Sequence, residues 1–364
     1  MKISLVAPDF SLKTFKRTKF LYDLLKDDFE LEVLVLHTNK VKKTIFDDNF
    51  DNLKKIRFDL GTVLKDFNNS IKGDLVYAIR SKPTSFGISM NIKHFKKIPI
   101  ILDIIDIEKN LCFPYSNNTI QNFLLSFFAI KDPNSYIFTF LGEKRIKLAD
   151  NITVASKKLQ KIYGGTYIPS IANNEIFDSE KYKIPEIREF MKWDKKVILY
   201  FGNLEYDTDF DNLCDVLKDF SDKIQLIVLN NTEEYKKIEK KYDFISFLGY
   251  QPELNQAKII SSADYTILPI KNINYSENYL PDEIYNYIAC NKKIISSKNF
   301  EELSCLKDKL LIYNNKEELK NILNKIANEE IIKEKYEISP SYQEVKDKMK
   351  KFFLEIMSKN QISE

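Results

Sequence analysis

Two aspartates follow a buried apolar run in the first half of the chain. Asp103 closes the run Ile98–Asp103, and Asp106 comes three residues later. A carboxylate at the carboxyl end of a strand can orient a hydroxyl group or take its proton during a reaction. A helix N-cap or a loop hydrogen bond is the other interpretation, and both stay open for this pair. Glu108 has the same two interpretations.

Basic side chains follow one side of the first expected helix, near Leu12–Leu25. They are Lys13, Lys16, Arg17 and Lys19. An aromatic-rich stretch further along holds Phe123, Phe127, Phe128, Tyr136, Phe138 and Phe140. Basic and aromatic side chains together are typical of a surface that docks at an anionic membrane. A solvated basic face with ordinary core aromatics is the alternative.

The residues that usually bind transition metals are scattered. The cysteines are Cys112, Cys214, Cys290 and Cys305, and the histidines are His37 and His94. No CxxC spacing occurs, so the sequence predicts no metal site and no cofactor. Free, scattered cysteines suit a reducing compartment. No run approaches the roughly 18–20 apolar residues of a spanning helix, and the apolar start is too short for a signal peptide. We therefore expect a cytoplasmic protein, either soluble or peripheral on the inner face of the membrane.

Charge is divided unequally between the two halves of the chain. Residues 1–172 carry 27 Lys and Arg against 18 Asp and Glu, whereas residues 173–364 carry 29 against 35. A basic half suggests an anionic partner such as lipid or phosphate, and unequal solvated surfaces are the alternative. The lysines are dispersed and no recognition motif is present, so we expect no nucleic acid partner.

Two successive series of short apolar runs and helical patterns must position these side chains. In the first half, the expected strands are Ile3–Ala7, Leu31–Leu36, Asp74–Ala78, Ile98–Asp103 and Asn151–Ala155. In the second half, they are Val197–Phe201, Ile224–Leu229, Ile245–Leu248, Tyr265–Leu268 and Lys293–Ser296. Continuous apolar strands separated by helices favour parallel sheets covered on both faces.

The connections divide the 364 residues into three expected parts. Residues 1–172 and 173–335 form two Rossmann-like domains, joined by an irregular polar stretch. Residues 336–364 hold a lysine-rich helix whose apolar stripe must pack on a neighbouring surface. Paired Rossmann-like domains usually bind a ligand at the carboxyl ends of their strands.

Six segments, in order, resemble the GT-B glycosyltransferases of family 4. They are Lys82–Gly87 with Ile98–Glu108, Ala149–Pro169, Asn174–Phe177, Ile198–Leu204, Phe247–Pro269 and Leu280–Ala289. Within the second, Ala149-Asp150-Asn151-Ile152-Thr153-Val154 and Tyr163-Gly164-Gly165 are similar to the family's AD-x-ITV and YGG elements. The order and spacing of these short segments, over residues 80–300, carry the resemblance.

The resemblance implies two doubly wound domains that face a central cleft, with a C-terminal helix that crosses back to the first domain. It implies a retaining transferase without an essential metal. Such an enzyme moves a sugar from a nucleotide-sugar donor to a glycan or lipid-linked acceptor, in cell-surface polysaccharide or glycoconjugate assembly. The second domain binds the donor and the first binds the acceptor.

Positions at strand ends and on the first helix, together with the resemblance, give the candidate site residues. Asp103 and Asp106 are the expected catalytic residues, and Lys13, Lys16 and Arg17 lie on the acceptor and membrane side. The expected donor-binding residues are Gly202, Asn203, Pro269, Leu280, Pro281, Asp282, Glu283 and Asn286. The turn at Gly202 lets the backbone approach the phosphates, and the helix near Asp282 presents its N-terminus to them.

Three positions of this donor site depart from the family pattern. The family's Lys aligns with Glu283, its ribose-binding Glu with Asn286, and a Gly with Asn291. An acidic side chain beside phosphate lowers affinity, because like charges repel in a low-dielectric cleft. A second interpretation is therefore a catalytically inactive GT-B-like partner or regulatory subunit of another glycosyltransferase. A two-lobed binder of the periplasmic type is a third, and the missing signal peptide disfavours it.

Overall fold

The computed structural model describes most of the chain. The described residues are 1–37, 44, 46–59, 61–108, 135–202, 208–229, 238, 241–249, 251–271, 281, 283–297, 310–330 and 340–361. They form two compact units. The first unit combines Met1–Ser170 with Gln343–Glu364, and the second unit is Ile171–Tyr342.

The first unit is built on a parallel seven-stranded sheet with the order β3-β2-β1-β4-β5-β6-β7. The strands are β1 (Lys2–Ala7), β2 (Glu30–His37), β3 (Leu53–Arg57), β4 (Leu75–Ile79), β5 (Ile100–Ile104), β6 (Asn151–Val154) and β7 (Thr166–Tyr167). The central strands are buried along their whole length, as expected for a sheet covered on both faces.

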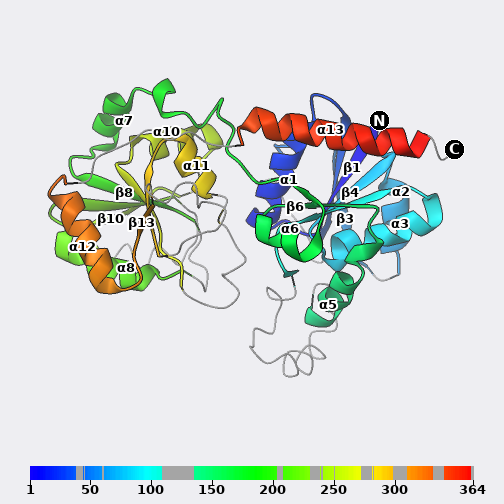
Figure 1. Ribbon diagram of the computed structural model, residues 1–364, viewed down its shortest axis with the longest axis horizontal. Coiled ribbons are helices and arrows are strands. Elements are labelled where there is room, and N and C mark those ends of the chain that lie inside the picture. The colour runs from blue at the N-terminus through cyan, green and yellow to red at the C-terminus, as the bar shows by residue number, and fades with distance from the viewer. Residues whose placement is uncertain are drawn as a thin grey trace. The chain divides into compact units, whose positions relative to one another are not determined.

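Helices cover both faces of this sheet (Figure 1). They are α1 (Leu12–Leu25), α2 (Val63–Ser70), α3 (Ile88–Lys96), α5 (Tyr136–Lys144), α6 (Lys157–Tyr163) and α13 (Tyr342–Gln361), with short turns at Pro83–Gly87 and Ile146–Leu148. Side chains of α2, α3 and α6 join one apolar cluster with Val76 and Ala78 of β4. Tyr77 lies between those two residues and points to the opposite face, because successive strand side chains alternate.

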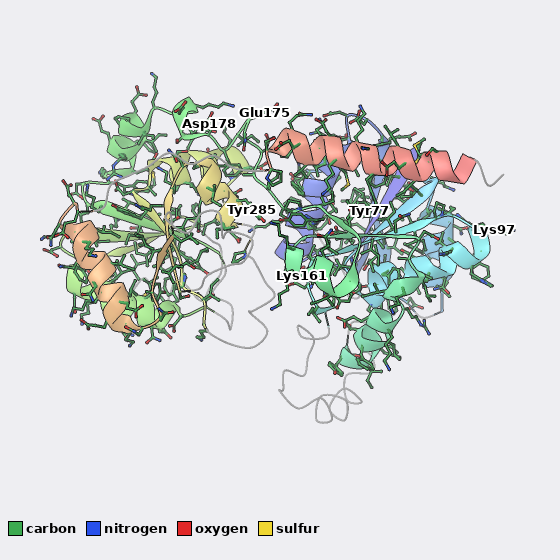
Figure 2. The ribbon with its side chains drawn as sticks, in the orientation of Figure 1. Tyr77, Lys97, Lys161, Glu175, Asp178 and Tyr285 are labelled. Atoms are coloured by element: carbon green, nitrogen blue, oxygen red, sulfur yellow. The ribbon has the colours of Figure 1, made fainter. Side chains whose placement is uncertain are left out.

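Helix α13 belongs to the first unit although it ends the chain. Its apolar stripe is buried, with Met349 and Phe353 fully inaccessible to solvent. The Phe353 ring lies 5.5 Å from the Tyr77 ring and 5.6 Å from the Phe29 ring, between centroids. Figure 2 labels Tyr77 among the strands below this helix. The Lys348 ammonium donates to the carbonyl of Tyr167, which ties α13 to β7.

The second unit repeats the plan with six parallel strands in the order β10-β9-β8-β11-β12-β13. They are β8 (Lys196–Phe201), β9 (Ile224–Leu229), β10 (Ile245–Phe247), β11 (Tyr265–Leu268), β12 (Lys293–Ser296) and β13 (Leu310–Ile312). The helices are α7 (Ile184–Met191), α8 (Phe210–Leu217), α10 (Glu253–Ser262), α11 (Glu283–Ala289) and α12 (Lys316–Ala327), with short turns at Ser179–Lys181 and Lys218–Phe220. In Figure 1, α10 and α11 lie on one side of this sheet, and α8 and α12 lie on the other.

An aspartate just before a strand fastens the start of a neighbouring strand at three places. These residues are Asp74, Asp150 and Asp264, and they precede β4, β6 and β11. Their carboxylates accept the backbone N–H of Lys2 at 2.8 Å, Ile100 at 2.8 Å and Val197 at 2.9 Å, respectively. At Asp150 and Asp264, the Ala-Asp elements of the resemblance therefore hold neighbouring strands together.

The predicted fold class is confirmed: both units are doubly wound parallel sheets. The ten predicted strands all occur, whereas β3, β7 and β13 were not predicted. All three lie at the edge of a sheet, where strands are often short or carry polar residues. Of the predicted helix over Tyr235–Tyr242, only residues 238, 241 and 242 are described, and the part of the predicted helical region that precedes residue 135 lies outside the described residues.

Candidate functional site

The carboxyl end of the first sheet gathers charged side chains around one point. Strand β1 pairs with β2 on one side and β4 on the other, so the direction of winding reverses between β1 and β4. Ligands of doubly wound folds usually bind at such a switch point. Asp9 follows β1, Arg80 follows β4, and Asp106 and Glu108 follow β5.

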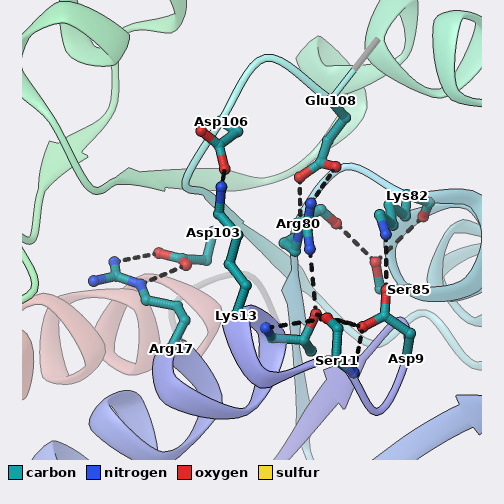
Figure 3. A network of polar contacts seen from close by, with 11 residues as sticks. Asp9, Ser11, Lys13, Arg17, Arg80, Lys82, Ser85, Asp103, Asp106 and Glu108 are labelled. Carbon is teal, nitrogen blue, oxygen red and sulfur yellow. Dashed lines mark hydrogen bonds and ion pairs between the residues drawn. The ribbon is translucent and has the colours of Figure 1, made fainter. Parts of the chain in front are cut away.

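Four acidic and four basic side chains meet there as four ion pairs (Figure 3). The pairs are Arg17–Asp103, Arg80–Glu108, Lys82–Asp9 and Lys13–Asp106. The formal charges of the eight groups balance. Both arginine pairs are buried, whereas each lysine pair has a member that reaches solvent.

Asp103 is held in a fully buried, bidentate pair with Arg17. The guanidinium donates to both carboxylate oxygens at 2.8 Å, and it also donates to the Ile168 carbonyl at 2.9 Å. The Thr153 hydroxyl donates to the same carboxylate at 2.7 Å. Asp103 has no exposed surface, so this arrangement suits a residue that fixes the sheet rather than one that contacts a substrate.

Arg80 and Glu108 form the second buried pair. Arg80 donates to the two oxygens of Glu108 at 2.6 and 2.8 Å. Arg80 has a backbone φ of 67°, in the left-handed region that non-glycine residues rarely adopt. The Ser85 hydroxyl donates to its carbonyl at 2.7 Å, which helps to hold this turn. The pair thereby anchors the segment after β5 that carries Asp106.

Asp9 lies in the turn between β1 and α1 and is surrounded by donors. It accepts from the Ser11 N–H at 3.0 Å, the Thr14 hydroxyl at 2.7 Å and the Lys82 ammonium at 2.7 Å. The Ser11 hydroxyl donates to it as well. Burial by itself would raise the pKa of Asp9, but the charges of Lys82 and Arg80 outweigh it and hold that pKa well below its usual range. Asp9 therefore stays ionised.

Asp106 has a different balance of contacts. It is 4% exposed, and one carboxylate oxygen lies 2.5 Å from the Lys13 ammonium. Burial raises the pKa of Asp106, and the charge of Glu108 adds to that shift, while Lys13 and Arg80 offset it only in part. Of the two predicted catalytic residues, Asp106 is the one whose partner reaches solvent.

The prediction that Arg17 lies on an exposed basic face of α1 is wrong. This side chain is 1% exposed and points to Asp103, because a guanidinium inside the fold needs a carboxylate partner. Lys13 pairs with Asp106, and Lys19 pairs with Asp23 one turn further along the helix. Lys16 is half-buried. Of the aromatic stretch, Phe123, Phe127 and Phe128 lie outside the described residues, and Tyr136 is buried.

Three residues of the four ion pairs were not predicted as site residues from the sequence. Asp9, Arg80 and Lys82 stand in the turns after β1 and β4, at the same sheet edge as Asp106. Their position directly after predicted buried strands was the available signal, since the carboxyl ends of parallel strands meet at one edge.

The second sheet has its own switch point between β8 and β11. Gly202 follows β8, and Pro269 follows β11. A Cβ atom on Gly202 would come within 2.8 Å of the Tyr200 hydroxyl, so a larger residue there would displace that ring. The Tyr287 hydroxyl of α11 accepts the Phe201 N–H at 2.8 Å, which fixes the helix against the end of β8.

The predicted donor-binding residues are described in part. Pro269 and Pro281 are buried, Glu283 is 8% exposed and Asn286 is half-buried. The charge of Glu283, after burial, helps to raise the pKa of Tyr287 well above its usual range. Asn203, Leu280 and Asp282 lie outside the described residues.

Asn291 takes the place of a family glycine for a local reason. It follows α11 with a φ of 56°, in the left-handed region. After glycine, asparagine is among the residues that adopt this conformation most readily at the end of a helix. The next residue, Lys292, is buried and donates to the carbonyls of Ser261 and Ala263 at the end of α10. This departure therefore preserves the fold.

The described ranges hold neither a candidate metal site nor a candidate membrane span. No three His, Cys, Asp or Glu side chains there gather in a way that could hold a metal ion. No helix in that part of the chain combines the length and the apolar character needed to cross a bilayer.

Comparison with known proteins gives matches in structure alone. No protein family model and no curated protein sequence matches the chain. HepE from Anabaena, solved with UDP-glucose, matches with a TM-score of 0.71 and 12% identity over 98% of this chain and 100% of that one. Sucrose-phosphate synthase from Thermosynechococcus elongatus matches with a TM-score of 0.67 and 12% identity over 98% of this chain and 99% of that one. WaaG, a glycosyltransferase involved in lipopolysaccharide biosynthesis, matches with a TM-score of 0.60 and 10% identity over 97% of this chain and 95% of that one.

These likenesses extend over nearly the whole of each chain, with both sheets included. At 10–12% identity they establish architecture and leave the chemistry to the residues described above. The chain has the GT-B fold, as the six sequence segments predicted.

Proposed function

We propose that this protein is a glycosyltransferase that moves a sugar from a nucleotide-sugar donor to a glycan or lipid-linked acceptor. The observation that carries the proposal is the full-length likeness to HepE, whose structure contains UDP-glucose. In this proposal the second unit binds the donor near Gly202 and α11, and the first unit binds the acceptor near Lys13 and Asp106. The reaction is retaining and needs no metal, and it serves cell-surface polysaccharide or glycoconjugate biosynthesis.

The proposed location is the cytoplasm, at the inner face of the membrane. The excess of basic residues over 1–172 supports attraction to anionic lipid. Co-sedimentation with vesicles that contain anionic lipid, compared with neutral vesicles, tests this part of the proposal. Equal recovery with both vesicle types would remove the membrane from it.

A thermal-shift screen against UDP-, GDP-, CMP- and dTDP-sugars tests the donor. A ligand that binds only the native state, at about a hundredfold over its Kd, stabilises by about 2.7 kcal/mol. A shift with one nucleotide class supports the transferase and identifies the base. No shift with any of them, in a protein that melts cooperatively, counts against it.

A second candidate is an inactive partner or regulatory subunit of another glycosyltransferase. The observation in its favour is the buried Glu283 carboxylate at the start of α11, where the resemblance expects a cation. A buried negative charge opposes a diphosphate. Co-purification with a second glycosyltransferase, together with an empty nucleotide screen, would favour this candidate.

Glu283→Lys is expected to tighten nucleotide-sugar binding by about tenfold, because it replaces repulsion of the phosphates with attraction. Titration calorimetry with the nucleotide found in the screen measures the change. Glu283→Gln is the matched control, since it removes the charge without adding a cation, and we expect an intermediate affinity. Weaker binding by both variants would mean that Glu283 itself contacts the donor.

Asp106→Asn is expected to lower turnover by about a hundredfold, because the amide cannot exchange a proton with an acceptor hydroxyl as the carboxyl group can. Steady-state assays with the identified donor and acceptor measure this effect. Asp219→Asn is the control, because Asp219 forms an exposed pair with Lys320 in the second unit. Unchanged turnover in Asp106→Asn would remove this carboxylate from the mechanism.

A further inference from the structure

The four ion pairs of the first unit differ in how firmly they are held. In the arginine pairs Arg17–Asp103 and Arg80–Glu108, every side chain is at most 5% exposed and each guanidinium contacts both oxygens of its partner. Breaking either would leave an uncompensated buried charge, which is strongly destabilising. These two pairs are therefore fixed. A ligand that arrives from solvent can replace a partner only in the lysine pairs, Lys82–Asp9 and Lys13–Asp106.

The two lysine pairs are unequal in turn. The Asp9 carboxylate accepts hydrogen bonds from four donors, and the positive charge of Arg80 also stabilises it. Asp9 therefore stays ionised and keeps its ion pair with Lys82. Asp106 is more buried, and among the described residues its carboxylate has Lys13 as its ion-pair partner and accepts no further hydrogen bond. Lys13 is 28% exposed and can turn toward solvent. Lys13–Asp106 is therefore the pair that can open.

We infer that Lys13 is the binding cation of an anion site in the first unit, and that Asp106 closes this site until it takes up a proton. An incoming anion replaces the Asp106 carboxylate as the partner of Lys13. Among the described residues, the charged groups that face Asp106 are Lys13 from α1, Arg80 after β4 and Glu108 after β5. The charges of Arg80 and Glu108 cancel each other, so Asp106 loses its counter-ion when Lys13 leaves, and a proton takes that place.

The position of Lys13 favours an anion for a second reason. It is the second residue of α1, a helix of 14 residues whose N-terminus carries a partial positive charge. A phosphate or carboxylate group bound by Lys13 would lie beside that helix end. The ligand class is therefore a small oxyanion group on a larger molecule. Under the proposed function, on which only this step rests, the group belongs to the acceptor or to the donor phosphates.

Calorimetric titration with inorganic sulfate tests the site without any sugar, since sulfate keeps its charge between about pH 5 and pH 8. Titrations in two buffers of different ionisation enthalpy count the protons taken up. We expect an uptake of about one proton per sulfate, and binding that strengthens by up to about tenfold per pH unit as the pH falls. The sign follows because the complex binds one proton more than the free protein does.

Three variants separate the parts of the inference. Asp106→Asn should bind sulfate more tightly than the parent protein, with no proton uptake and no pH dependence. Lys13→Met should weaken binding by at least about tenfold. Lys19→Met removes the same charge from the same helix, from a pair that does not involve Asp106, and should behave like the parent protein.

Several results would overturn the site. One is sulfate binding in the parent protein without proton uptake, and another is equal affinity in Lys13→Met. A third is the absence of binding in both the parent protein and a folded Asp106→Asn variant. UDP and glycerol phosphate then identify the source of the anion: whichever of them loses affinity in Lys13→Met is the ligand that Lys13 contacts. If sulfate binds with these properties but no nucleotide-sugar shifts the melting temperature, the anion site is supported and the proposed transferase function is rejected.

Discussion

Replacing Arg17 with methionine is expected to destabilise the first unit by about 3–5 kcal/mol. Methionine keeps the aliphatic part of the side chain, so the change chiefly removes the guanidinium. It leaves the Asp103 carboxylate fully buried, with Thr153 and Tyr77 as its remaining hydrogen-bond donors among the described residues. A buried charge without its counter-ion is among the most destabilising changes that a single substitution makes. The expected loss is large compared with the stability of an ordinary domain.

The two units allow this loss to be assigned to one of them. The single tryptophan, Trp193, is buried in the second unit, so its fluorescence follows the unfolding of that unit by urea. Circular dichroism follows both units together. In Arg17→Met we expect an earlier transition by circular dichroism and an unchanged midpoint by fluorescence. The double variant Arg17→Met with Asp103→Asn should recover part of the loss, because no unpaired charge remains. A loss below about 1 kcal/mol would show that the pair matters little.

Phe353→Ala is expected to cost about 3–5 kcal/mol in the first unit, through the lost burial and the cavity left behind. The ring is fully buried between Phe29 and Tyr77, so α13 would lose its central contact with the sheet. Urea unfolding followed by circular dichroism measures the loss.

The neighbouring residue gives the control for this substitution. Leu354 is 48% exposed on the same turn of α13, and Leu354→Ala should stay within about 0.5 kcal/mol of the parent protein. A similar, small loss in both variants would mean that α13 is only loosely docked. In that case the helix would contribute little to the first unit, despite its burial.

The sequence predicted the fold well where burial imposes a pattern. Strands such as β4 and β8 are continuous apolar runs, and no alternation of polar residues obscures them. Strand β3 reads Leu-Lys-Lys-Ile-Arg and lies at an edge, where lysines protect against unwanted pairing, so its pattern resembles a loop. Helix α7 was missed because the polar stretch before Pro185 hid its start.

The candidate site was harder to predict, because partners far apart in the chain decide it. Helical periodicity placed Arg17 with its basic neighbours, yet its carboxylate partner is 86 positions away. The same holds for Arg80 and Glu108, which come from different strand ends. A sequence shows which charged residues stand near strand ends. It does not show which of them are paired, and pairing separates a fixed residue such as Asp103 from an exchangeable one such as Lys13.

The return of α13 to the first unit sets the order in which the molecule can be completed during synthesis. Phe353 packs on Phe29 and Tyr77, residues that leave the ribosome some 300 positions earlier. All of the second unit, Ile171–Tyr342, is therefore translated before the first unit receives its last helix. Until then the face of the first sheet around Tyr77 lacks its cover. The first unit is thus completed only after the second unit has been translated. During that time an apolar surface of the first unit stays uncovered and must be kept from aggregating.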